Sequence, residues 1–165
     1  ATGLTGPIGA TGPMGATGAA GPTASRGVNF GSDVALTGSF QTVLDLQNVN
    51  EGSVDNQITT TFANRLIVNA TVNVKTTSST NPGMAICRLS ASDGTGPNNG
   101  VAAFSEDSSF TTTTLNGEFV ELAMTGAVDK AVGTYNIIVQ CRWAGSSPPL
   151  SAAAGNLTVI ATGSS

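Results

Sequence analysis

The sequence contains no histidine, the residue that most often does acid–base chemistry near neutral pH. Ser-His-Asp and Cys-His arrangements are therefore excluded within this chain. Zinc would have to use the two cysteines with carboxylates, an uncommon set of ligands. Glu106 and Asp107 are adjacent, and neighbours in a strand point to opposite faces, although spacing leaves open a glycosidase pair assembled from distant carboxylates. We expect a protein that is not an enzyme and that holds no cofactor or metal ion.

Charge and long apolar runs are also scarce. Only 10% of the residues are charged, with ten acidic side chains, six basic ones and a net charge of -4. The basic residues are scattered along the chain, whereas phosphate contacts need clustered Lys or Arg, so we expect no nucleic acid as a partner. No run of about 18 apolar residues is present, and we expect no insertion into a membrane.

The chain does contain a glycine at every third position near its start. The seven glycines are Gly3, Gly6, Gly9, Gly12, Gly15, Gly18 and Gly21. This pattern is typical of a collagen triple helix, in which three polyproline-like chains coil so closely that only glycine fits at the axis. The alternative is a flexible glycine-rich linker, but a linker does not require glycine at every third position. The repeat predicts a homotrimer with a triple-helical stalk over residues 1–25.

The third position of each triplet contains no proline, although animal collagens place hydroxyproline there. Four of these positions are threonines: Thr5, Thr11, Thr17 and Thr23. The pattern favours a bacterial or bacteriophage source, and the threonines are candidate sites for O-linked sugar or simply tolerated small residues. Because the sequence begins within a triplet, we expect a mature or excised C-terminal piece of a longer repeat.

Residues 26–165 differ sharply in composition from the stalk, since they carry all the charged and aromatic side chains. Runs of β-branched and aromatic residues alternate with Gly, Asn, Ser and Pro clusters, without a period of 3.6 residues. Expected strands cover 34–37, 39–46, 57–77, 83–92, 101–107, 109–115, 117–128, 133–143 and 155–163. Apolar residues alternate with mostly polar ones over 66–75, and over 135–142 the residues Tyr135, Ile137, Val139 and Cys141 alternate with those between them, so one face of each segment is expected to point inward. This spacing predicts an all-β head, a trimeric jelly roll of two sheets, with an immunoglobulin-like sandwich as the alternative.

The order of these parts resembles a known group of proteins. A collagen-like stalk leading straight into a compact β head is similar to the trimeric jelly rolls of the complement and tumour necrosis factor type. Bacterial exosporium and cell-surface collagen-like glycoproteins share this order, as do some bacteriophage fibres and spikes. The triplets GAT, GLT and GPT resemble the exosporium group. The segments SFQTVLDL, MAICRLSAS, NIIVQCRW and NLTVIATG are similar to the heads of bacterial collagen-like proteins.

The resemblance implies an extracellular structural or adhesive fibre tip on a bacterial cell or spore. The head would clamp the triple helix and present a contact surface to a host or surface glycan or to a protein receptor. The alternative is the receptor-binding tip of a bacteriophage tail fibre or spike on the virion, and a secreted lectin comes third.

Two cysteines lie in expected strands. Each of Cys87 and Cys141 has an apolar residue two positions away, so both are expected to face inward. In an extracellular chain they suggest one disulfide, with two buried free thiols as the alternative. The segment SASDGTGPNNG lacks the dense carboxylates of a calcium loop, and we interpret it as a surface turn.

An arginine follows each cysteine directly. Arg88 and Arg142 are therefore expected on the opposite side of their strands from the sulfur atoms. If the two strands are neighbours, the guanidinium groups converge and become candidates for a shared site for sulfate, a sugar acid or a carboxylate. Bridging to Glu118, Glu121 or Asp107, within or between subunits, is the favoured interpretation.

Overall fold

The computed structural model describes residues 3, 12, 14, 22–30, 33–46, 57–60, 63–76, 83–92, 102–103, 108–112, 119–144 and 150–163. Most of the glycine repeat therefore lies outside the described residues. The strands within them are β1 (Pro22–Phe30), β2 (Val34–Ala35), β3 (Gln41–Asp45), β4 (Ile58–Thr60), β5 (Asn64–Thr76), β6 (Gly83–Ser92), β7 (Ala102–Ala103), β8 (Ser108–Thr112), β9 (Phe119–Lys130), β10 (Gly133–Ala144) and β11 (Leu150–Gly163).

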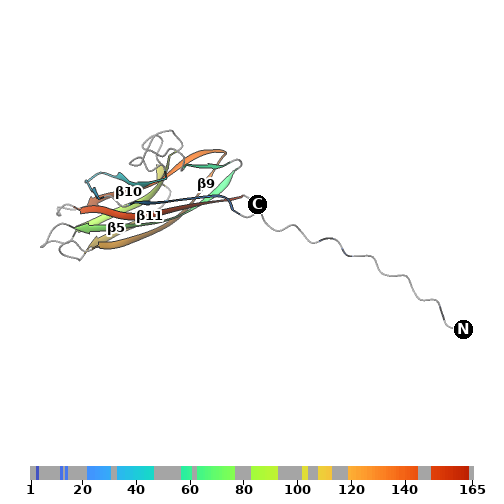
Figure 1. Ribbon diagram of the computed structural model, residues 1–165, viewed down its shortest axis with the longest axis horizontal. Coiled ribbons are helices and arrows are strands. Elements are labelled where there is room, and N and C mark those ends of the chain that lie inside the picture. The colour runs from blue at the N-terminus through green and yellow to red at the C-terminus, as the bar shows by residue number, and fades with distance from the viewer. Residues whose placement is uncertain are drawn as a thin grey trace.

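These strands form two antiparallel sheets. Sheet A has the order β1-β11-β5-β9, with β2 also paired to β11. Sheet B has the order β3-β10-β6-β7, with β4 paired to β10 and β8 to β6. Figure 1 shows β5 and β11 side by side along the length of the head. The predicted all-β fold with two sheets is confirmed, and the strand order is consistent with a jelly roll.

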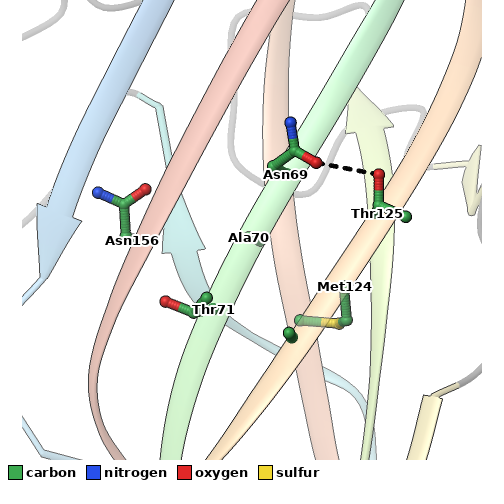
Figure 2. Close-up of a pocket in the computed structure, with 7 residues that line it drawn as sticks. Asn69, Ala70, Thr71, Met124, Thr125 and Asn156 are labelled. Atoms are coloured by element: carbon green, nitrogen blue, oxygen red, sulfur yellow. Dashed lines mark hydrogen bonds between the residues drawn. The ribbon is translucent and has the colours of Figure 1, made fainter.

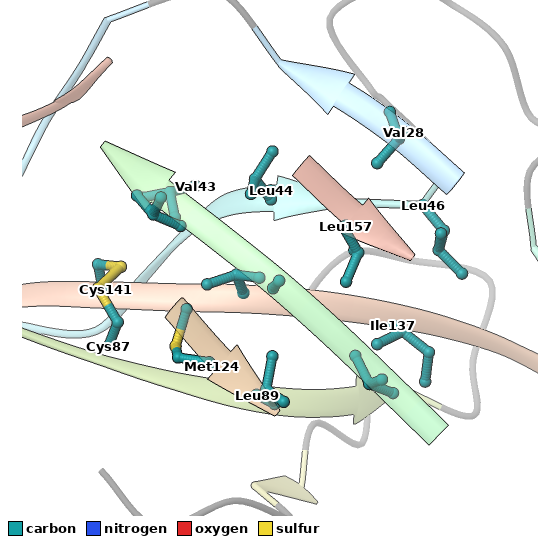
Figure 3. Close-up of a cluster of buried hydrophobic side chains, with 14 of the residues drawn as sticks. Val28, Val43, Leu44, Leu46, Cys87, Leu89, Met124, Ile137, Cys141 and Leu157 are labelled. Atoms are coloured by element: carbon teal, nitrogen blue, oxygen red, sulfur yellow. A yellow bond between two sulfur atoms is a disulfide. The ribbon is translucent and has the colours of Figure 1, made fainter. Parts of the chain in front are cut away.

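The hydrophobic core lies between the two sheets, where the inward side chains of each strand meet (Figure 3). Period-two alternation places one face of β5 inward, and the buried residues of that strand are Leu66, Val68, Ala70, Val72 and Val74. Leu157 and Val159 of β11 extend this layer, and Ile137 and Val139 of β10 face it from sheet B. The alternation predicted for residues 66–75 is therefore confirmed.

The predicted disulfide is also confirmed. Cys87 on β6 and Cys141 on β10 are directly opposite each other in the antiparallel register, and their sulfur atoms are bonded. Both residues are fully buried among the core side chains (Figure 3). The bond therefore links two neighbouring strands of sheet B from the inner face of the sheet.

The segment 57–77, expected as one strand, contains two. Strand β4 pairs with β10 of sheet B, whereas β5 lies in sheet A. Ile58 and Thr60 are buried in the same even-numbered phase as Leu66, so periodicity does not mark the change of sheet. Thr60 Oγ1 donates a hydrogen bond of 2.8 Å to the carbonyl of Ala131, a contact distant in sequence that fixes β4 beside the end of β9.

Strand β10 is more buried than its alternation predicts. Tyr135, Ile137, Val139 and Cys141 face the core as expected, but the opposite residues Asn136, Ile138 and Gln140 are buried as well. At Gln140 the cause is visible, because the side chains of Arg88 and Ser90 on the neighbouring strand β6 both contact its amide oxygen. A polar residue on the outer face of a sheet is thus enclosed by its polar neighbours.

Strand β1 begins at Pro22, within the range 1–25 that composition assigns to the stalk. It pairs with β11 from Pro22 opposite Thr162 to Phe30 opposite Gly155. The first residues of the head thus lie beside the last residues of β11, at one end of sheet A (Figure 1).

We expect Gly155→Ala to destabilise the head. A Cβ atom there would clash with the backbone carbonyl of Thr71 and lie 2.7 Å from Leu44 Cδ1. Relieving such a clash requires a shift of backbone, and overpacking of this kind costs about 1–3 kcal/mol. Denaturant unfolding followed by circular dichroism measures the loss.

The matched control is Gly27→Ala on β1, where the nearest atom to the new Cβ would be the Leu157 carbonyl oxygen at 3.5 Å. This is an ordinary contact, so the control is expected to unfold within about 0.5 kcal/mol of the parent. Equal stability of the two variants would contradict the close approach at Gly155.

Candidate functional site

The first candidate site is built on the outer face of sheet B, on the side away from the disulfide. Arg88 pairs with Gln140 across β6 and β10, and Arg142 pairs with Ile86. The two arginines thus lie on neighbouring strands and on the same face of the sheet, as their positions next to the cysteines predict. Arg142 is two residues further along β10 than Gln140, the residue opposite Arg88. We call Phe40, Arg88, Gln140 and Arg142 the arginine cluster.

Phe40 brings the two guanidinium groups together. It immediately precedes β3, the other neighbour of β10 in sheet B. Arg88 Cζ lies 3.9 Å from the centroid of the Phe40 ring and Arg142 Cζ lies 5.0 Å from it. A ring face attracts a cation, so one phenylalanine holds both charged groups at short range. Sequence reasoning missed Phe40 because it lies far from both arginines in the sequence, and no local pattern marks the contact.

Gln140 fixes the orientation of Arg88. Its Oε1 atom accepts hydrogen bonds from Arg88 Nε at 3.1 Å, from Arg88 Nη2 at 3.0 Å and from Ser90 Oγ at 3.2 Å. The Gln140 side chain is buried, and it is neutral. The guanidinium is therefore oriented by a neutral amide oxygen, and among the described residues it forms no ion pair.

Glu121, one of the carboxylates expected to bridge these arginines, lies on the other sheet and does not pair with them within one chain. Glu121 is exposed on β9 of sheet A, opposite Asn73. The ion pairs among the described residues join Arg65 to Asp129 and Lys75 to Asp33 instead. Glu118 and Asp107 lie outside the described residues.

A second candidate surface is the outer face of sheet A. Three rows of residues cross this face in register, each with one residue from β1, β11, β5 and β9. They are Ser25, Ile160, Ile67 and Ala127; Gly27, Thr158, Asn69 and Thr125; and Asn29, Asn156, Thr71 and Ala123. We call these twelve residues the neutral face, because none carries a charge. The Arg65–Asp129 pair lies next to it at one end of β5, and Lys75 lies near the other end.

A shallow depression of about 260 Å³ lies in the neutral face (Figure 2). Asn69, Thr71 and Asn156 line it with Ala70, Ala123, Met124 and Thr125. Thr125 Oγ1 donates to Asn69 Oδ1 at 3.0 Å, and Asn156 Nδ2 donates to Asn29 Oδ1 at 2.5 Å. The outward side chains of the lining are amides, hydroxyls and a methyl group, so the depression suits an uncharged contact with few hydrogen bonds.

Other predicted site residues fall mostly beyond the described part of the chain. Thr5, Thr11 and Thr17 lie outside it, and of Thr23 only the backbone, in β1, is described. Among the seven repeat glycines, Gly3 and Gly12 are described. Within the described ranges, no group of three His, Cys, Asp or Glu side chains is placed to hold a metal ion, and no helix is long and apolar enough to span a membrane.

Comparisons with known proteins find similarity in structure but not in sequence. No protein-family model matches the chain, and no curated protein sequence matches it. Among solved structures, the chain is similar to the Eiger tumour necrosis factor of S. frugiperda, with a TM-score of 0.49 and 8% sequence identity. The alignment covers 87% of this chain and 95% of that chain. The assignment of two antiparallel sheets therefore depends on the strand order and register of this chain itself.

We expect Gln140→Met to lower the free energy of unfolding by about 1–3 kcal/mol, because Arg88 and Ser90 lose a shared buried acceptor. Gln140→Glu is the matched control, since it keeps the acceptor atoms and adds a negative charge beside a guanidinium. Thermal and denaturant unfolding compare the two variants. We expect the glutamate variant to lose less stability than the methionine variant. A larger loss for the glutamate variant would mean that a carboxylate already balances the charge of Arg88.

Proposed function

We propose that this chain is the tip of a trimeric collagen-like fibre. Its β head holds three strands of a triple helix together and presents a contact surface, without catalysing a reaction. Seven glycines in strict phase support the triple helix. Apart from the two neighbouring residues, a Cβ built on Gly3 or Gly12 would meet nothing within 4 Å, so packing within a single chain gives no reason for glycine at these two positions.

The observation that carries the proposal is the direct join between repeat and sheet. Pro22, the first residue of β1, immediately follows Gly21, the last glycine of the repeat. Strand β1 is held by β11 along its length. A head that fixes the end of each repeat in this way would raise the local concentration of the three strands and set their register, if the heads themselves associate.

We propose further that the heads associate through the neutral face. Identical copies repel each other wherever like charges meet, and this face has no charge in its central rows. Ile67 is 37% exposed there, beside Ile160 and Ala127 in the same row. Strand β1 is an edge of the same sheet, so the point where the stalk joins the head adjoins this face.

The proposed location is extracellular, on a bacterial cell or spore surface. The Cys87–Cys141 disulfide supports an oxidising compartment, since disulfides are rare in reducing cytosol. Threonine in four of the third triplet positions, with no proline in any, supports a chain that needs no prolyl hydroxylase.

Interrupting the glycine repeat in the full chain tests this function. We expect Gly9→Ala, Gly12→Ala and Gly15→Ala together to abolish the polyproline-type circular dichroism band and its cooperative melt, because a methyl group does not fit at the triple-helix axis. The β-sheet signal of the head is expected to remain.

The control changes three third-position residues instead, with Thr11→Ala, Met14→Ala and Thr17→Ala. These side chains point away from the axis of a triple helix, and Met14 is 98% exposed in a single chain. The control is expected to keep the band and the melt. Identical spectra for the glycine variant and the parent would mean that the repeat is a linker.

A further inference from the structure

We infer that the arginine cluster on the outer face of sheet B binds a single acidic group, a carboxylate or a sulfate. The site lies on the opposite sheet from the neutral face, so it does not depend on the association of heads proposed above. It assigns a class of ligand to the head, whose second sheet otherwise has no role in the proposed fibre.

The first argument is the concentration of positive charge. Two guanidinium groups contact one phenylalanine ring, at 3.9 and 5.0 Å from its centroid. Like charges this close repel each other, and the ring face of Phe40 offsets only part of that repulsion. The ion pairs found among the described residues are made by Arg65 and Lys75 on sheet A. An acidic ligand between Arg88 and Arg142 would remove the remaining repulsion.

The second argument is the state of the hydrogen-bonding atoms. Arg142 Nε is buried and has no hydrogen-bond partner in the described part of the chain, and neither has Thr42 Oγ1 on β3. Thr42 is opposite Gln140 in the register, which places both unpartnered atoms beside the arginine cluster. A buried guanidinium N–H without an acceptor is costly, and an anionic oxygen is the strongest acceptor for it. The cluster therefore has donors in place for an acceptor that the described residues do not supply.

The third argument is the orientation of Arg88 before any ligand binds. Its Nε and Nη2 atoms are held by Gln140, while Nη1 takes no part in those two hydrogen bonds. Arginine presents planar donors that match the two oxygens of a carboxylate or sulfate. A guanidinium fixed in advance loses little side-chain freedom when it binds.

The size of the cluster limits the ligand. Two arginines on a head within a chain of net charge -4 can neutralise one or two negative charges, but they cannot follow a polyanion such as nucleic acid. An acidic saccharide or an acidic side chain of a second copy of this chain presents the required chemistry. A saccharide would bind from solution, whereas the side chain of a second copy would reach the site only when two chains associate.

The test uses the full chain and two free probes, glucuronate and sulfate. The unfolding midpoint is followed during titration with each probe, at constant ionic strength maintained with chloride. We expect the parent midpoint to rise with probe concentration. Arg142→Gln and Arg88→Gln are expected to weaken the apparent affinity by about tenfold or more, the effect of one charge-assisted hydrogen bond.

Arg65→Gln is the matched control, because Arg65 is exposed on sheet A and pairs with Asp129. It removes the same charge from the protein and should leave the response to both probes unchanged. Arg142→Lys is used as well, in case Arg142→Gln fails to fold. It keeps the charge but not the planar donors, so its affinity should lie between those of the parent and of Arg88→Gln.

Sedimentation of the same variants distinguishes the two sources. If the acidic group comes from a second copy, the free probes will leave the unfolding midpoint of the parent unchanged. Arg142→Gln will then need a higher protein concentration to associate than the parent does, whereas Arg65→Gln will associate like the parent. That result still supports the acidic site. An equal rise in every variant would be a general salt effect and would overturn the inference. No response in either experiment would overturn it too.

Discussion

Strand β11, the last strand of the chain, lies between β1 and β5 and forms backbone ladders with both. The arrangement of sheet A depends on this position, because β1 reaches the rest of the sheet through β11. Its inward residues Leu157 and Val159 contribute to the core, and Gly155 allows Leu44 of sheet B to approach the backbone closely. Packing between the sheets and attachment of the N-terminal strand therefore depend on the same fourteen-residue segment. In the proposed fibre, this pairing is what joins each stalk strand to its head.

The two outer faces of the sandwich have different chemistry. The face of sheet A is neutral in its centre, built from small amide, hydroxyl and aliphatic side chains in register across four strands. The face of sheet B holds two arginines on one phenylalanine ring, with a buried glutamine fixing one of them. A neutral face suits contact between identical copies, whereas a charged cluster suits a ligand of opposite sign. The division gives the proposed head one surface for assembly and another for recognition.

Sequence periodicity was sufficient for those features that depend on neighbours in the chain. It predicted the two-sheet all-β fold, the buried face of β5, the inward cysteines and the outward position of Arg88 and Arg142. It did not locate β1, because Arg26 interrupts the short alternation of Ala24, Val28 and Phe30, and the segment becomes a strand by pairing with β11. It also could not find Phe40, the enclosure of Gln140 or the neutral face. These depend on which strands become neighbours, which follows from the packing of the whole chain and not from any local run of residues.

The central claim is that three copies of this chain assemble, with the heads in contact and the glycine repeats along a common axis. Sedimentation equilibrium of the full chain tests it most directly, because it measures mass without assuming a shape. The account predicts a species of three times the 16.3 kDa chain mass. A single species at the mass of one chain, across the accessible range of protein concentration, would contradict it.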